Sequence, residues 1–147
     1  MKMQKLFIFF TAAIFLFSKA GLAHEHRTVA GKYEFVVGFL NEPAFSGQMN
    51  ALDLRITQDN EPVEGLEQTL EASVRYEDQK ESLPLTLKTR YKQPGAYAGY
   101  FFPTKPGKYS LEISGSIEGR PIQETFVTGE KFHAIEDPKP LSWPKPD

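Results

Sequence analysis

The 147-residue sequence lacks cysteine and contains only three histidines and one tryptophan. Without cysteine, the chain cannot be a disulfide-stapled mini-domain, a thiol enzyme or a zinc ribbon. Eleven glycines and eleven prolines are too few for a collagen-like or disordered chain. The longest apolar run, residues 6–17, is shorter than the about 20 residues that a membrane-spanning helix requires. A polytopic membrane protein is therefore excluded as well.

Clusters of positive charge are also lacking. The three lysines of residues 1–23 have no acidic counterpart, so the rest of the chain carries 14 basic against 19 acidic side chains. Phosphate backbones and anionic lipids both require clustered Lys and Arg. We therefore expect neither nucleic acid nor an anionic membrane surface to be the main partner.

Residues 1–23 have the layout of a secretory signal peptide. A short basic start precedes the apolar run 6–17, and two small-x-small sites follow it, which end at Ala20 and Ala23. We predict cleavage after Ala23, which leaves His24 as the new N-terminus; cleavage after Ala20 and an uncleaved anchor are the alternatives. The mature chain is expected to be exported to the periplasm or the extracellular space, with no membrane span.

Residues 33–136 alternate apolar and polar side chains in short segments that are separated by turn residues. This pattern predicts an all-β antiparallel sandwich of about seven strands. Pro84 indicates an edge strand, because proline cannot donate a hydrogen bond to the ladder. Helical periodicity is nearly absent, and 62–69 could hold one turn. The expected strands cover 33–40, 52–56, 70–76, 83–87, 97–102, 109–113 and 122–127.

The segment Gly107-Lys108-Tyr109 narrows the fold to an immunoglobulin-like sandwich. Such folds often place a Gly-x-Tyr at the start of the sixth strand, where the Tyr hydroxyl bonds back to the preceding corner. Here the motif stands before the sixth expected strand. Two flanking segments complete the predicted organisation, an N-terminal segment over 24–32 and a proline-rich tail over 137–147. We expect the tail to be extended and mobile, with Trp143 partly docked on the sandwich.

Two of the three histidines stand at the predicted mature terminus, in His24-Glu25-His26, and the third is His133. Cleavage after Ala23 would free an α-amino group with a pKa of about 8. A metal ion can displace the proton of this group and bind its nitrogen. Nitrogen sites with tetragonal geometry then become available, and such sites suit Cu(II) or, less readily, Ni(II).

Two geometries compete for this amine. In a planar chelate, the amine, the amide nitrogens of Glu25 and His26 and the His26 imidazole bind the metal. In a brace, the amine and the His24 imidazole form one half, and His133 is the distant histidine that closes it. The opposing interpretation is that His-Glu-His is an accident of a polar, flexible tail. We expect the chelate, which makes His26 the essential side chain.

The sequence contains few other residues or motifs that would indicate a catalytic or binding site. The sequence lacks a Gly-x-Ser-x-Gly elbow, a His-Glu-x-x-His helix, a phosphate loop and a dinucleotide fingerprint. Glu42, Asp53 and Asp59 are candidate oxygen ligands, but their spacing singles out none of them. The aromatic strand 97–102 carries rings on both faces. This indicates either an exposed apolar patch or a strand that a loop buries on both faces. An oxidative copper enzyme with a histidine brace would need a second well-placed histidine, so we expect no enzymatic activity.

Several short motifs resemble the small exported YtkA-like and FixH-like immunoglobulin-type domains. They are the strand entry 47–50, the alternating strand 52–56, the turn 61–63 and the late strand entry 106–111. Residues 23–26, Ala-His-Glu-His, are more loosely similar to the start of mature CopC, a periplasmic copper carrier. CopC also uses an Asp-x-His pair late in the chain, which this sequence lacks.

Together these patterns and resemblances imply an exported, non-enzymatic module that binds Cu(II) at its N-terminus and carries or buffers it. Its partners would be the metal ion and a membrane metal permease or another envelope protein. One alternative is an immunoglobulin-like interaction module of the bacterial envelope that binds no metal. Another is an accessory of nickel uptake.

Overall fold

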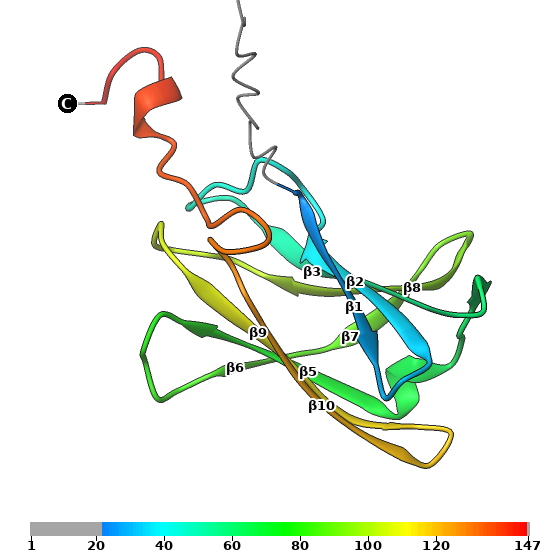
Figure 1. Cartoon of the computed structure of the whole chain (residues 1–147). Helices are drawn as coiled ribbons and strands as arrows, with labels where there is room; N and C mark the ends of the chain where they lie inside the picture. The colour runs from blue at the N-terminus through cyan, green and yellow to red at the C-terminus, as the bar shows by residue number, and fades with distance from the viewer. Residues whose placement is uncertain (1–21, 147) are drawn as a thin grey trace, which may run out of the picture.

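The computed structural model describes residues 22–146, which form two facing antiparallel sheets (Figure 1). The six-stranded sheet has the order β1 (His24–Val29), β2 (Tyr33–Phe39), β3 (Asn50–Gln58), β8 (Gln93–Phe101) and β7 (Leu87–Arg90), and the short β4 (Glu61–Pro62) also pairs with β3. The four-stranded sheet has the order β10 (Arg120–Val127), β9 (Tyr109–Ile117), β5 (Leu70–Tyr76) and β6 (Leu83–Leu85). The predicted antiparallel sandwich is confirmed, whereas almost all of the predicted signal peptide lies outside the described residues.

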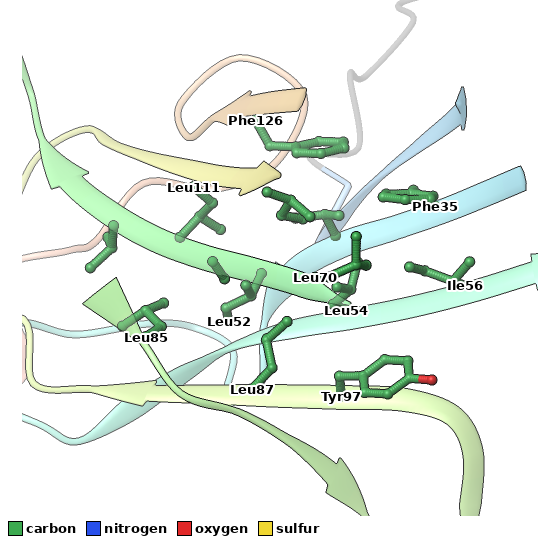
Figure 2. Packing of buried hydrophobic residues seen from close by; sticks show 14 of the residues in the cluster. Phe35, Leu52, Leu54, Ile56, Leu70, Leu85, Leu87, Tyr97, Leu111 and Phe126 are labelled. Carbon is green, nitrogen blue, oxygen red and sulfur yellow. The ribbon is translucent and has the colours of Figure 1, made fainter. Parts of the chain in front are cut away.

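The core lies between the two sheets and is built from the inward positions of both. Alternate side chains of each strand meet there, as Figure 2 shows, because successive residues of a strand point to opposite faces. The Tyr97 hydroxyl, at the rim of this core, donates to the Val63 carbonyl oxygen at 2.6 Å and so fixes the connection between β4 and β5. Fully buried core side chains include Tyr33, Phe35, Phe39, Leu52, Leu54, Ile56, Leu111, Ile113 and Phe126.

The central strand β3 is buried on both faces over much of its length, although its alternation predicts a half-buried strand. Leu52 and Leu54 point into the core, as expected. Ala51 and Asp53, on the opposite face, are also buried. The reason is position. β3 lies between β2 and β8, and side chains of the outer strands β1 and β7, His24 and Arg90, reach Asp53 across its outer face.

The expected strand over 83–87 is two strands in different sheets. β6 pairs with β5 in the four-stranded sheet, and β7 pairs with β8 in the six-stranded sheet. Leu85 and Leu87 both remain buried, because the chain crosses from one sheet to the other between them while it keeps its inward face. Pro84 lies in the edge strand β6, as its missing N–H group predicts.

The predicted N-terminal segment 24–32 is part of the sandwich, because residues 24–29 form the edge strand β1. Its sequence shows no apolar alternation, since two of its three inward positions carry the charged side chains Glu25 and Arg27. The proline-rich tail leaves the sandwich at the end where β1 begins (Figure 1) and holds one 3₁₀ turn, Lys139–Leu141. Trp143 is 87% exposed, so the expected docking of its ring on the sandwich is not observed.

The tyrosine corner that the motif Gly107–Tyr109 predicts is present. The Tyr109 hydroxyl donates to the carbonyl oxygen of Lys105 at 2.8 Å, and its ring lies 5.0 Å from that of Tyr76 between centroids. One 3₁₀ turn, Leu66–Gln68, accounts for the single helical turn expected near 62–69. No helix within residues 22–146 is long and apolar enough to cross a membrane.

Two substitutions test these contacts. Tyr109→Phe should lower the free energy of unfolding by about 0.5–1.5 kcal/mol, because it removes one hydrogen bond and keeps the ring. Leu54→Ala should lower it by about 2–5 kcal/mol, because it leaves a cavity in the core. Urea denaturation followed by circular dichroism measures both. Tyr91→Phe, at a tyrosine that is 85% exposed, is the control and should change little. A cost for Tyr109→Phe no larger than for this control would contradict the corner assignment.

Candidate functional site

Strand β1 places its two histidines on the outer face of the six-stranded sheet. His24 lies opposite Gly38, and His26 lies opposite Val36. The His24 side chain keeps 26% of its surface exposed, and His26 is exposed. Glu25, between them, points to the other side of the strand and is buried. The predicted His-Glu-His motif is thus part of an ordered strand, with both histidine side chains on one face.

Arg27 holds this strand in place by joining the edges of the two sheets. Its Nε and Nη2 atoms donate to Oε1 of Glu25 at 3.1 and 2.7 Å. Its Nη1 atom donates to Oε2 of Glu124 at 2.7 Å and to the carbonyl oxygen of Thr125 at 3.1 Å, both on β10. The guanidinium carbon lies 4.0 Å from the ring centroid of Phe126. These contacts close the side of the sandwich at which β1 and β10 meet.

The His24 imidazole is held by a buried carboxylate. Its Nε2 atom lies 3.1 Å from Oδ2 of Asp53, two strands away on β3. Because an ionised carboxylate only accepts hydrogen bonds, Nε2 carries the proton and Nδ1 keeps its lone pair when the ring is neutral. Gly38 makes this reach possible, since a Cβ atom there would come within 2.5 Å of the His24 ring. The fold therefore fixes both the orientation and the tautomer of His24.

Asp53 has two further partners on the same face. Nη2 of Arg55, on β3, lies 3.3 Å from its Oδ2 atom, and Nη1 of Arg90, on β7, lies 3.1 Å from its Oδ1 atom. Asp53 is only 2% exposed. One buried carboxylate therefore organises an imidazole and two guanidinium groups that come from three different strands.

The expected planar chelate does not fit strand β1. It requires the amide nitrogens of Glu25 and His26 to face a single metal ion, whereas successive amides of a strand point in opposite directions. Forming it would require residues 24–26 to leave their pairing with β2 and would pull Glu25 away from Arg27. The imidazoles of His24 and His26 need no such rearrangement, because they already share a face.

His133 is not on strand β1 with the other two histidines. It is exposed in the segment after β10, and its charge acts on Glu42 in the loop between β2 and β3. Within residues 22–146, no three or more His, Asp and Glu side chains are grouped so that they could hold a metal ion. A brace closed by His133 would use only two side chains, His24 and His133, and it stays a prediction.

Sequence reasoning named Asp53 as one of several oxygen ligands and missed its role as the partner of His24. It also missed Gly38, Arg55 and Arg90. The available signal was an acidic residue within an apolar strand, at a position that faces away from the core. Its partners could not be found in the same way, because register places them opposite one another across β1, β2, β3 and β7.

A second surface feature lies at the end of β8. Phe102 is 56% exposed, Tyr100 is 52% exposed, and the other two rings of that segment, Tyr97 and Phe101, are buried. The apolar patch expected for this strand is therefore present. Phe102 borders a cleft of about 420 Å³, and further lining residues are Val74, Tyr76, Leu83, Pro103 and Lys105.

No family model and no curated protein matches the sequence. Among solved structures, the chain is similar to a DUF4426 family protein from Pseudomonas aeruginosa PAO1, with a TM-score of 0.55 and 12% identity over 78% of this chain and 98% of that chain. It is also similar to the Lin-41 filamin domain, with a TM-score of 0.39 and 13% identity over 69% of this chain and 90% of that chain. At such identities a likeness concerns the fold, and the first one supports the immunoglobulin-like sandwich. Neither assigns the chain to the YtkA-like, FixH-like or CopC families.

Glu42 is a partly buried carboxyl group beside His133. Among the described residues, neither of its oxygens makes a side-chain hydrogen bond of good geometry. Burial raises the pKa of the Glu42 carboxyl, and the charge of His133 only partly opposes this effect. Its folded-state pKa therefore lies above the value of the unfolded chain, so the ionised carboxylate disfavours folding at neutral pH.

Glu42→Gln should accordingly raise the thermal midpoint at neutral pH. The advantage should disappear as the pH falls below about 4.3, the ordinary glutamate pKa, because the wild-type carboxyl is then protonated in both states. Thermal denaturation over a pH series measures this. Glu130→Gln, at an exposed acid that does not contribute to the raised pKa of Glu42, is the control. An advantage that persists unchanged at acid pH would contradict the assignment.

Proposed function

We propose that this chain is an exported, non-enzymatic module that binds Cu(II) at its mature N-terminus and carries or buffers the ion. The observation that supports this proposal is the hydrogen bond between His24 Nε2 and Asp53. It leaves Nδ1 as the free nitrogen, on the side of the ring nearest its own backbone. In metal sites, a carboxylate that accepts from one imidazole nitrogen orients the ring and raises the basicity of the other nitrogen.

Cleavage after Ala23 would supply the second donor. The backbone nitrogen of His24 then becomes an α-amine, and this amine and Nδ1 can bind one ion in a single chelate ring. His26, two residues further on the same face, offers a third nitrogen without leaving the strand. A set of amine and imidazole nitrogens suits Cu(II), which such ligands generally bind more tightly than Ni(II).

The resemblance of residues 23–26 to CopC agrees with this proposal, and a membrane metal permease or another envelope protein is the partner we propose for transfer. The alternative cargo is Ni(II), for a role in nickel uptake. The relative affinities of the protein for Cu(II) and Ni(II) decide between the two ions. A metal-free interaction module is the second candidate function. It is favoured by the cleft beside Phe102, an exposed ring that has no role in metal binding.

Processing is the first test. The mature protein should begin at His24, because Ala23 ends a small-x-small site and strand β1 starts directly after it. Intact mass and N-terminal sequencing of the exported protein measure this. A chain that begins at Gly21 would place three residues before His24 and would remove the amine from the proposed donor set.

Copper titration of the mature protein is the second test. We expect one Cu(II) equivalent, the largest loss of affinity for His24→Ala, a clear loss for His26→Ala and little change for His133→Ala. Asp53→Asn should weaken binding by roughly 10–100-fold, because the carboxylate that orients His24 is lost. Affinity should also fall below about pH 6, because protons then compete with the metal ion for the imidazoles as well as for the amine.

Two controls make this experiment decisive. An N-terminal extension should abolish tight binding while it leaves the thermal midpoint unchanged, and equal affinity in the extended protein would contradict the proposal. Proton release separates the geometries, because a planar chelate must also displace the amide protons of Glu25 and His26. Release of these two additional protons, together with no effect of Asp53→Asn, would favour the chelate.

A further inference from the structure

The buried Asp53 lies between two very small residues on the outer face of the six-stranded sheet. Register places Gly38 of β2 opposite Asp53 on one side and Ala98 of β8 opposite it on the other. Residues that pair across neighbouring strands point to the same face of a sheet. Because neither neighbour has a side chain longer than a methyl group, long side chains of the next strands can cross above both of them.

Two side chains use these openings. His24 of β1 crosses above Gly38, where an added Cβ atom would come within 2.5 Å of its ring. Arg90 of β7 crosses strand β8 from the opposite side. His24 and Arg90 thus reach one carboxylate, and each passes over one intervening strand to do so.

Arg90 reaches Asp53 from a diagonal position. Lys88 is the β7 residue that pairs with Ala98 and so stands in the row of Asp53. The pairing of β7 with β8 shifts register between Thr89 and Arg90. Irregularities of this kind re-aim side chains within a sheet. The contact between Arg90 and Asp53 is therefore a feature of this local geometry and not of a regular cross-strand pair.

The two carboxylate oxygens of Asp53 have different partners. Oδ1 lies 3.1 Å from Nη1 of Arg90, whereas Oδ2 lies 3.1 Å from Nε2 of His24 and 3.3 Å from Nη2 of Arg55. The Arg90 side chain is 21% exposed and that of Arg55 is 51% exposed. A shielded contact on Oδ1 opposes rotation of the carboxylate about its Cβ–Cγ bond. It therefore keeps Oδ2 directed toward His24.

We propose that Arg90 is a positioning residue for the metal site. It holds the Asp53 carboxylate so that Oδ2 accepts the Nε2 proton of His24, which leaves Nδ1 as the free nitrogen. Arg90 acts only through Asp53, because a guanidinium group has no lone pair to offer a metal ion. The effect on metal affinity rests on the proposed copper binding, whereas the effect on the His24 ring is tested on the metal-free protein.

The first experiment records ¹⁵N NMR spectra of the histidine rings in the metal-free mature protein, at a pH of about 8, where an ordinary imidazole is neutral. The ¹⁵N chemical shifts distinguish protonated from unprotonated ring nitrogens, and only three histidines contribute. The wild type should show the His24 proton fixed on Nε2, and Arg90→Gln should give shifts averaged between two tautomers. Arg90→Lys should restore the wild-type spectrum, because the contact with Oδ1 uses a single donor nitrogen that an ammonium group can replace. Lys88→Gln, at an exposed charge of the same strand, is the matched control and should change nothing.

The second experiment is Cu(II) titration of the same variants. Arg90→Gln should weaken binding by about fivefold, less than the roughly 10–100-fold loss expected for Asp53→Asn. Circular dichroism checks that each variant is folded. Arg90→Met, which keeps an unbranched side chain, replaces Arg90→Gln if the latter does not fold.

Two results would overturn the inference. One is a His24 spectrum that Arg90→Gln leaves unchanged. The other is tighter Cu(II) binding by Arg90→Gln, which would show that Arg90 competes with His24 for Asp53. If the wild type binds no Cu(II) but its His24 spectrum responds to Arg90→Gln, the proposed copper function fails and the role of Arg90 in orienting the ring stands.

Discussion

Arg27 links the first strand to both sheets, and the candidate site depends on that link. Strand β1 is an edge strand, and Val29 is its only apolar inward residue. The pairing of Arg27 with Glu25 and Glu124 therefore supplies much of what attaches β1 to the opposite sheet. Most of this contact is shielded from water, because Glu25 is buried and the guanidinium group lies over Phe126. Removal of Arg27 would be strongly destabilising, because it would leave the buried Glu25 carboxylate without its main partner.

The two faces of this strand have different tasks. Its inward side chains attach it to β10, and its outward histidines stand above the buried Asp53 on β3. Because a strand alternates its side chains, fixing one face also fixes the other. Copper binding through the side chains of His24 and His26 would leave the pairing of β1 with β2 in place. Binding through consecutive backbone amides would break this pairing. This difference is the main physical reason to prefer the side-chain geometry.

Asp53 is the centre of the polar contacts on the outer face of the six-stranded sheet. It contacts the imidazole of His24 and the guanidinium groups of Arg55 and Arg90. Burying a carboxylate is costly, and the contacts with His24, Arg55 and Arg90 offset this cost for Asp53.

The sequence alone determined the sandwich, because period-two apolar alternation and a Gly-x-Tyr corner are local signals, and Tyr109 makes the contact that its motif predicts. It also identified His24 and His26 as candidates and Pro84 as an edge residue. Only the tertiary structure decided that residues 24–29 form a strand, that the leucines of 83–87 divide between two sheets, and that His24 meets Asp53. These features depend on register and on charge pairs between residues far apart in the chain, and no short window of sequence contains both partners.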